Sequence, residues 1–477
     1  SLARGKTPGT DGLPAEFYSM YLDLLAPCLV KMFHTALDRG YLPETTRQAV
    51  VSTLPKSHRD PVLLASYRPL SILNTDYKVL SKIIADRLMP LLPTIIHEDQ
   101  SGFTPRRNTS LNIRRLYHIM DRAKEDYPNA YCLSLDIEQA FDTIRWEYLW
   151  ETLKRFAIPD TLIRWICLLY VDPSARVKTG RRISAPYPIR RGTRQGCPLS
   201  PILFVMAMEP LAARLRRWGE LWGLQLDGRT HAISLYGDDM LIYVKDPQVD
   251  VTSMVETLTD FANVSGLCIN YNKSYIFPLR QNSPPISLTF QGQSLRWAPD
   301  TFWYLEINIY HDRSDILDGN LGRSLQSLRA SVAFWKALPL AVPGRIALAK
   351  MVMLPQILYS FTNLPVVVPA PFFKTLDTLL IELIWGTGRR RVALTTLQLP
   401  TSQGGLGAPN FRAYYYAAQL QWLTYWMAGR HLVETGLTPS QVKRGALHRM
   451  ILQKETPLQQ LPLLPRITHK ILSACLR

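Results

Sequence analysis

Apolar side chains recur at helical spacing through most of the first third of the chain and again from about residue 312 onward. In the segment 22–37 they keep to one helical face, and Gly40 then marks the end of that helix. The same spacing predicts helices around 77–91 and 116–123, with a short strand at 50–54 before them. The two outer thirds are therefore predicted to be mainly helical.

The middle of the chain changes to short apolar runs that are typical of buried strands. One run, 131–135, ends at Asp136. Two more, 233–236 and 240–244, flank a Gly-Asp-Asp turn sequence at 237–239 and predict a hairpin.

Helices are also predicted within this middle region, at about 143–156 with Asp142 as the N-cap, and at about 249–264. The order is helices, then mixed strands and helices, then helices again. This order predicts a fold of the α+β class.

Composition suggests the kind of partner. The 477 residues predict two to four structural units, and 47% apolar residues are enough for a large core. Lys and Arg number 55 against 38 Asp and Glu, a net charge of +17 that indicates a polyanionic partner, either nucleic acid or an anionic membrane surface. The chain starts without Met and without a signal-peptide core, so we expect a fragment of a longer protein.

One uncharged segment, 351–373, is long enough to cross a bilayer. It contains four prolines, which break the backbone hydrogen bonding that a bilayer requires. No membrane span is therefore expected. These prolines are Pro355, Pro365, Pro369 and Pro371.

The strongest candidate chemistry lies in Asp136, Asp238 and Asp239, which the predicted strands could bring to one sheet edge. Three converging carboxylates repel each other unless cations neutralise them. Oxygen ligands of this kind suit Mg²⁺, and two such ions about 3.5–4 Å apart form the clamp used in nucleotidyl transfer. Gly-Asp-Asp is also an ordinary surface turn, so the residues alone leave both interpretations open.

Two further features admit a functional and a structural interpretation. In the loop 194–201, Gly196 permits close backbone approach and Gln195 can hydrogen-bond a base edge or backbone, but the loop can equally be a basic connection to a buried helix. Phe141 could lie beside the sugar of a bound nucleotide and exclude a 2′-hydroxyl, or it could be a core residue at a helix start.

Taken in order, the motifs resemble those of the reverse transcriptase of LINE-type (non-long-terminal-repeat) retrotransposons. The match covers nearly the whole chain. The segments that carry it are GKTPGTDGLPAEFY (5–18), SYRPLSILNTDYKVLSKIIADRL (66–88), QSGFTPRRNTS (100–110), LSLDIEQAFDTIRW (133–146), GTRQGCPLSPILF (192–204), YGDDMLIY (236–243), SGLCINYNKS (265–274), PGRIALAKMVMLPQILYSF (343–361) and GGLGAPNFRAYYYAAQLQW (404–422).

The resemblance implies a right-hand polymerase fold: fingers with an N-terminal extension at 1–125, a palm with an antiparallel sheet, helices and fingers-side insertions at 126–311, and a helical thumb and post-thumb region at 312–477. It implies an RNA-directed DNA polymerase with an RNA template, a DNA primer or target strand and deoxynucleoside triphosphates as partners. Cytoplasmic assembly and nuclear action are expected from the family, and the oligomeric state stays open.

The resemblance also assigns roles to single residues. Asp136, Asp238 and Asp239 would hold two Mg²⁺ ions, with Mn²⁺ as a possible substitute and the Ile137 carbonyl as a further ligand. Lys273 would protonate pyrophosphate. The nucleotide and template contacts would come from Phe141 as the sugar gate, Gln195, Gly196, Arg68 and Arg107.

Three positions depart from the family pattern: Gly237 replaces an Ala, Gln139 a Lys, and Glu306 a Gly. Glu306 lies in the segment that resembles the primer grip, where a carboxylate would repel the primer's phosphates. Two alternatives to an active reverse transcriptase follow: a decayed palm that survives as a nucleic-acid-binding scaffold, and an RNA-dependent RNA polymerase. The segment RQGCPLSP (194–201) and Phe141 argue against the second.

Overall fold

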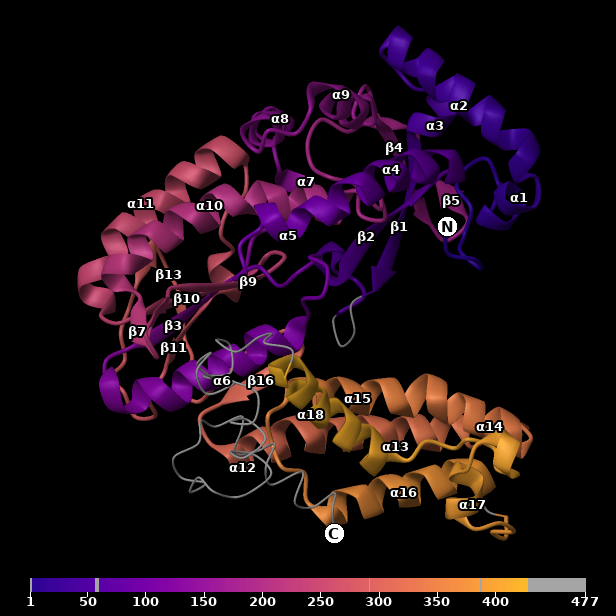
Figure 1. Ribbon diagram of the computed structural model, residues 1–477, viewed down its shortest axis with the longest axis vertical. Coiled ribbons are helices and arrows are strands. Elements are labelled where there is room, and N and C mark those ends of the chain that lie inside the picture. The colour runs from indigo at the N-terminus through magenta and orange to yellow at the C-terminus, as the bar shows by residue number, and fades with distance from the viewer. Residues whose placement is uncertain (1, 56–59, 291, 387, 428–477) are drawn as a thin grey trace.

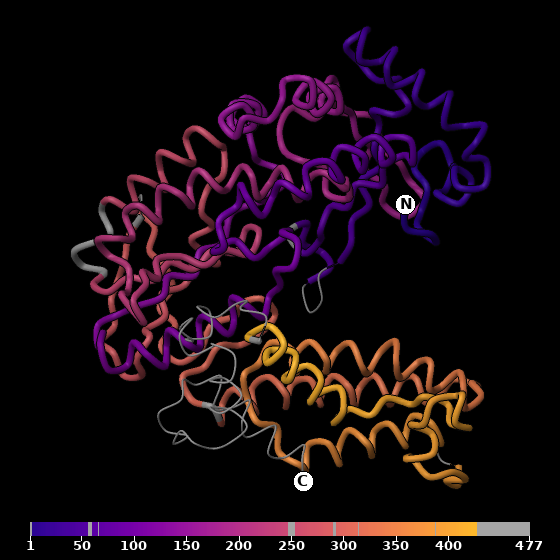
Figure 2. The backbone as a smooth tube through the Cα atoms, in the orientation of Figure 1, coloured from indigo at the N-terminus to yellow at the C-terminus, as the bar shows by residue number. Residues whose placement is uncertain are grey.

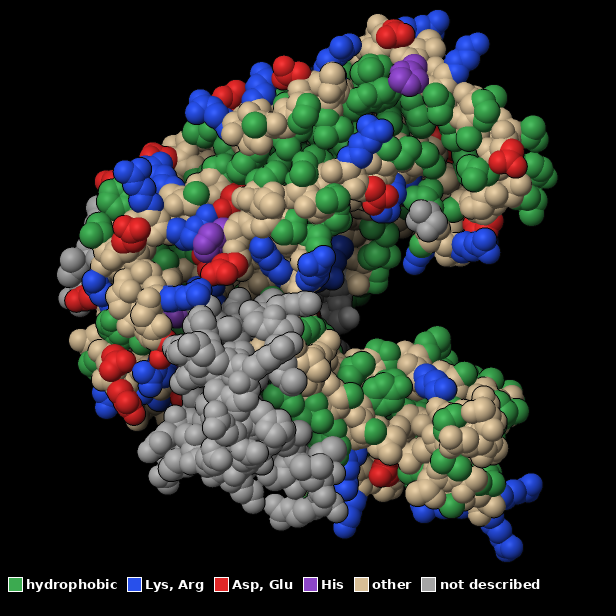
Figure 3. All heavy atoms as spheres, in the orientation of Figure 1, with side chains coloured by type: hydrophobic (Ala, Val, Ile, Leu, Met, Phe, Trp, Pro, Cys, Tyr) green, Lys and Arg blue, Asp and Glu red, His purple; other side chains and the backbone are tan. Residues whose placement is uncertain are grey.

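The computed structural model describes residues 2–55, 60–290, 292–386 and 388–427. The chain follows an open arc (Figures 1 and 2), with the N-terminal elements in one arm and the helices after residue 312 in the other. Figure 3 shows a wide hollow between the two arms. The central sheet lies where the arms meet.

The N-terminal arm is built on a five-stranded sheet of order β2-β1-β4-β5, with β6 also paired to β4. β1 pairs antiparallel with β2 and parallel with β4, although β4 follows more than a hundred residues later in the chain. The strands are β1 Gln48–Pro55, β2 Tyr67–Leu73, β4 Ser174–Thr179, β5 Arg182–Ile183 and β6 Tyr187–Pro188.

Short and long helices surround this sheet. The predicted end of the first long helix is confirmed, because Gly40 caps α2 with a left-handed φ of 82°. The helices are α1 Ala15–Met20, α2 Leu22–Arg39, α3 Glu44–Arg47, α4 Thr75–Leu88, α5 Leu92–Ile95 and α9 Asp160–Leu168.

The central sheet has the order β14-β11-β3-β10-β9, with β3 antiparallel to both neighbours. Its two faces bury different cores, because side chains alternate along each strand. On β3, Leu133 packs in the core with α10, whereas Cys132 packs in the core with α6 and the C-terminal helices. The strands are β3 Tyr131–Leu135, β9 Ile233–Tyr236, β10 Asp239–Val244, β11 Tyr275–Pro278 and β14 Arg296–Trp297.

The predicted strand at 131–135 and the predicted hairpin are confirmed, and the helix predicted at 249–264 is α11. The helix predicted at 143–156 is α8, Trp146–Arg155, which begins three residues later than predicted. The prediction of Asp142 as its N-cap is wrong, because Asp142 lies in the separate short helix α7, Ala140–Thr143, and the N-cap of α8 is Arg145. The two helices are separate because the Ile144 carbonyl accepts from Gly192 N and Arg145 N donates to Ser265 O, so both groups leave the helical ladder. The helices around the sheet are α6 Thr109–Asp126, α7 Ala140–Thr143, α8 Trp146–Arg155, α10 Ser200–Trp222 and α11 Pro247–Ser265.

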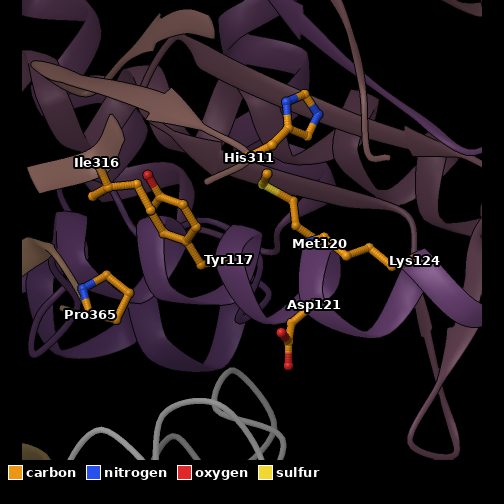
Figure 4. Close-up of a pocket in the computed structure, with 7 residues that line it drawn as sticks. All are labelled: Tyr117, Met120, Asp121, Lys124, His311, Ile316 and Pro365. Carbon is orange, nitrogen blue, oxygen red and sulfur yellow. The ribbon is translucent and has the colours of Figure 1, made fainter. Parts of the chain in front are cut away.

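The second arm is helical, as predicted, and starts with the hairpin of β15 Thr301–Tyr304 and β16 Ile307–Tyr310. Where this arm meets α6, a cavity of about 30 Å³ is lined by residues of both, including Tyr117 and Ile316 (Figure 4). The helices are α12 Arg313–Ile316, α13 Arg323–Trp335, α14 Val342–Leu348, α15 Leu354–Asn363, α16 Ala370–Trp385, α17 Leu394–Gln398 and α18 Phe411–Met427, with π-helical turns at Leu317–Gly322 and Ala349–Met353.

Within the described ranges no helix is both long enough and apolar enough to cross a membrane. The uncharged segment 351–373 is divided among a π-helical turn, α15, a connection without regular structure, and the start of α16.

Candidate active site

The register of the central sheet brings the three aspartates to one edge. Leu135 on β3 pairs with Met240 on β10, so one step further along both strands Asp136 lies opposite Asp239. Asp238 belongs to the turn between β9 and β10, which begins with Gly237 at a left-handed φ of 64°. Residues separated by about a hundred positions therefore become neighbours at the end of two adjacent strands.

The three carboxylates interact electrostatically. Burial, and then the neighbouring Asp136, raise the pKa of Asp238. The pKa of Asp239 rises to about 7, because burial and the charges of Asp238, Asp136 and Glu306 all disfavour its ionised form. Lys273 opposes these effects, and its Nζ lies 3.3 Å from Oδ2 of Asp136.

The donor set suits a hard divalent cation, because partly buried carboxylates that repel each other are stabilised by a shared positive charge. In the part of the chain that the structure describes, however, no three His, Cys, Asp or Glu side chains converge into a ready metal cage. Lys273 pairs with Asp136 instead. The aspartates thus fit a metal by chemistry and by strand position, while the side-chain arrangement is that of a lysine-paired site.

The backbone carbonyl of Ile137 also points toward the sheet edge that holds the aspartates. Asp136 O accepts from Asn270 N at 2.7 Å, and Glu138 N donates to Cys268 O at 2.8 Å. In an antiparallel bridge of this kind the intervening residue directs its own N–H and C=O to the opposite side. The Ile137 carbonyl therefore points away from 268–270 and toward the β10 side.

Phe141, on α7, is half-buried and makes two ring contacts. It stacks on Phe204 of α10 with ring centroids 4.6 Å apart, and Phe103 meets it edge-on at 6.1 Å. One face of the ring is therefore held by core packing. Both interpretations of this residue are compatible with that packing.

Gln195 and Gly196 lie against the N-terminal sheet. Gln195 O accepts from Ser71 N of β2 at 2.9 Å, and its Nε2 donates to Asp142 Oδ2 at 3.3 Å. Gly196 has a φ of 107°, and a Cβ there would lie 2.5 Å from Ser71 O. The close backbone approach that the sequence suggested is therefore to β2 of the same chain.

The two candidate arginines differ. Arg68 is exposed on β2, where it can meet a ligand. The guanidinium of Arg107 donates to the carbonyls of Ile96, His97 and Gln100, at 3.0, 2.5 and 2.7 Å. The prediction that Arg107 contacts the triphosphate finds no support in this geometry, because its donors hold the loop 96–100 instead.

Glu306 lies in the two-residue turn between β15 and β16. Leu305 and Glu306 both have left-handed φ values, 46° and 60°, as a type I′ hairpin turn requires. The charge of Glu306 raises the pKa of Asp239, so this turn lies close to the aspartates. The hairpin is tied to the second arm, because Tyr359 Oη donates to Leu305 O at 2.6 Å.

Sequence reasoning missed Gln100, a fully buried residue of the loop before α6 whose amide contacts Gly237. Gln100 has no charge and lies outside any helical or strand pattern of the sequence. Its position in the segment QSGFTPRRNTS (100–110), which carries part of the family resemblance, was the one sequence feature that could have indicated a role.

Comparison with known proteins gives a consistent result. Residues 54–307 match the family model described as reverse transcriptase (RNA-dependent DNA polymerase). The chain is 30% identical to the Transposon TX1 uncharacterized 149 kDa protein of Xenopus laevis, over 88% of this chain and 32% of that protein. It is 23% identical to the Pol polyprotein of retrotransposable element R2DM of Drosophila melanogaster, over 85% and 38% of the two chains.

It is 24% identical to the RNA-directed DNA polymerase from mobile element jockey of Drosophila melanogaster, over 74% of this chain and 39% of that protein. The chain thus spans roughly a third of the length of these relatives. Among solved structures, telomerase from Candida albicans in complex with an RNA fragment aligns with 96% of this chain and 69% of that chain at 11% identity and a TM-score of 0.41.

Replacing Asp239 by Asn should stabilise the metal-free protein at high pH. The pKa of Asp239 is raised from its ordinary 3.8 to about 7 on folding, so the stability tied to its protonated form is complete below about pH 4 and is lost as pH rises through 7. At pH 8 in chelator, D239N should raise the free energy of unfolding by on the order of 2 kcal/mol. Urea unfolding from pH 5 to 8 measures this.

The exposed Asp126 provides the matched control, since D126N removes the same charge from a solvated position. If the free energy of unfolding of D239N changes with pH as that of the wild type does, Asp239 is not the source of the destabilising charge.

Replacing Glu306 by Gly should stabilise the chain by about 1 kcal/mol, because only Gly adopts a left-handed φ without steric cost. It should also lower the pKa of Asp239 by removing a nearby negative charge. The E306Q variant keeps the strained backbone and removes only the charge, so it should lower that pKa and stabilise the chain only at the pH values where Asp239 ionises, without the pH-independent gain expected for E306G. Urea unfolding as a function of pH separates the two effects, and a less stable E306G would contradict the turn assignment.

Proposed function

This chain belongs to the reverse transcriptase (RNA-dependent DNA polymerase) family, and we propose that it is the polymerase of a LINE-type retrotransposon, extending a DNA 3′-hydroxyl along an RNA template. The placement of Asp136 opposite Asp239 at the end of β3 and β10, with Asp238 in the adjoining turn, is the observation that carries this proposal. The activity of the whole protein is proposed, since the chain spans about a third of its relatives.

We assign the three aspartates and the Ile137 carbonyl to two Mg²⁺ ions, with Mn²⁺ as a substitute. When bound, such ions activate the 3′-hydroxyl and neutralise the triphosphate. The raised pKa values of Asp238 and Asp239 support this assignment, because a cation would restore the ionised forms that burial disfavours. Ion binding would displace Lys273 from Asp136.

Lys273 is half exposed and is proposed to donate a proton to the leaving pyrophosphate. Its distance of 3.3 Å from Asp136 supports a role at the reacting phosphates. Arg68, exposed on β2, is the remaining arginine proposed for the triphosphate. Gln195 and Gly196 are proposed to position β2 and the incoming nucleotide together, since both contact the β2 backbone.

Phe141 is proposed as the sugar gate. Its ring is fixed between Phe204 and Phe103, so it cannot move aside at low cost when a 2′-hydroxyl approaches. A rigid ring would exclude a ribonucleotide by steric overlap with its 2′-hydroxyl, the one group that distinguishes it from a deoxynucleotide.

The hollow between the arms in Figure 3 is proposed to hold the RNA template paired to the DNA strand, with deoxynucleoside triphosphates entering beside β2. The net charge of +17 supports a nucleic-acid partner. The division into fingers, palm and thumb at 125/126 and 311/312, and cytoplasmic assembly with nuclear action, stay predictions from the family.

Primer extension on an RNA template tests the proposal. The wild-type chain should extend a DNA primer with Mg²⁺ and deoxynucleotides, and D238N should lose at least about 1,000-fold in rate because a buried metal ligand is gone. D238N should bind the primer–template as tightly as the wild type. D126N, an exposed substitution of the same kind, serves as control. A folded wild-type chain that binds nucleic acid without extending it would leave the scaffold alternative.

Replacing Phe141 by Ala should relax sugar selection. We expect the ratio of kcat/KM for deoxynucleotides over ribonucleotides to fall by about 100-fold, since removing the ring opens space for the 2′-hydroxyl. F334A, which removes an exposed ring from the second arm, should leave the ratio unchanged. An unaltered ratio in F141A would assign Phe141 to core packing alone.

A further inference from the structure

We propose that Gln100 is the positioning residue of the catalytic turn: its buried amide fixes Gly237, and through it the backbone that carries Asp238 and Asp239 at the end of β9 and β10. The proposal rests on the proposed function, because it takes these aspartates as the metal ligands. It adds a residue that touches neither the metal nor the substrate.

One side chain satisfies both polar groups of Gly237. The Oε1 atom of Gln100 accepts from Gly237 N at 2.9 Å, and its Nε2 donates to Gly237 O at 3.2 Å. The same Oε1 accepts from Gly102 N at 2.8 Å. Gln100 has no solvent exposure, so water cannot replace these bonds.

The backbone on either side of Gln100 is paired with β9, the strand that leads into the turn. Leu235 N donates to Asp99 O and Ser101 N donates to Leu235 O, both at 2.8 Å. A Cβ on Gly102 would lie 2.2 Å from Gly237 N, so the loop and the turn are in direct backbone contact. The loop 99–102 therefore acts as a short additional strand beside the turn.

The loop itself is anchored to rigid elements. Asp99 is almost fully buried and pairs with Arg115 of α6, with 2.5 Å between Oδ1 and Nη1. Ser101 Oγ donates to Asn112 Oδ1 at 2.7 Å, and Asn112 Nδ2 donates to Leu235 O at 2.8 Å. Arg107 holds the carbonyls at the start of the loop. The loop that carries Gln100 is therefore held in place by α6, and Gln100 in turn holds the turn at Gly237.

The turn needs such a restraint for a physical reason. Asp238 and Asp239 carry like charges at partly buried positions, and Gly237 ahead of them has the widest conformational freedom of any residue. Repulsion between the carboxylates would be relieved by rotating the turn open. The two hydrogen bonds from Gln100 to Gly237 oppose that rotation, whereas a buried glutamine that only filled the core would not need to contact the turn.

The test compares Gln100→Met with Gln419→Met. Methionine keeps the length of the side chain and removes its hydrogen bonds. Gln419 is the matched control, because it is also buried and its amide also bonds backbone carbonyls, those of Phe361 and Leu364 in the second arm. Both variants are expected to lose stability, so stability alone does not decide.

Two readouts do not depend on polymerase activity. Hydrogen–deuterium exchange of peptides covering 235–240 should be at least tenfold faster in Q100M than in the wild type, and unchanged in Q419M. Titration with Mn²⁺, followed by electron paramagnetic resonance without nucleic acid, should give a dissociation constant at least tenfold weaker in Q100M only. In extension assays the Mg²⁺ concentration for half-maximal rate should rise in Q100M, while KM for the primer–template stays constant.

A folded Q100M chain with wild-type exchange in 235–240 and wild-type Mn²⁺ affinity would overturn the proposal. If Q100M does not fold, Q100E keeps the volume and the accepting oxygens and loses the donor to Gly237 O when ionised, so the same two readouts apply. If the wild type neither binds Mn²⁺ nor extends a primer, the proposed function fails, and exchange in 235–240 still decides whether Gln100 holds the turn.

Discussion

The repulsion between partly buried carboxylates at the end of β3 and β10 is the constraint on which the rest of the site depends. Asp136 and Asp239 face each other because of strand register, and Asp238 follows from the turn. Bringing like charges together in a low-dielectric environment costs free energy that surrounding structure must offset. Lys273 offsets part of it by charge, and the packing of the sheet on both faces holds the strands in place.

Packing on both faces also links the site to the two arms. One face of the sheet shares a core with α10 and the N-terminal elements, and the other shares a core with α6 and the second arm. The β15–β16 turn affects the charge of Asp239 electrostatically through Glu306, and it is tied to α15 through Tyr359. A displacement of the second arm is therefore mechanically connected to the electrostatics of Asp239.

The sequence predicts the strands at the site well, because each is a short apolar run that ends at an aspartate or at the Gly-Asp-Asp turn. It does not predict the break between α7 and α8, since the groups that pull residues 144 and 145 from the helix come from residues 192 and 265. Arg107 shows a second limit of prediction from sequence. An arginine in a basic loop can bind a phosphate or backbone carbonyls, and the sequence does not distinguish the two. Gln100 shows a third, because its role depends wholly on a residue 137 positions away.

The parallel pairing of β1 with β4 bears on how the chain is made. On a ribosome β1 emerges long before β4, so the N-terminal sheet stays incomplete until about residue 188 has left the exit tunnel. Until then one edge of β1 is open to strands of other nascent chains. Translation that stalls between residues 55 and 174 would therefore release a product prone to aggregate, and a chaperone that shields this edge would raise the yield of native protein.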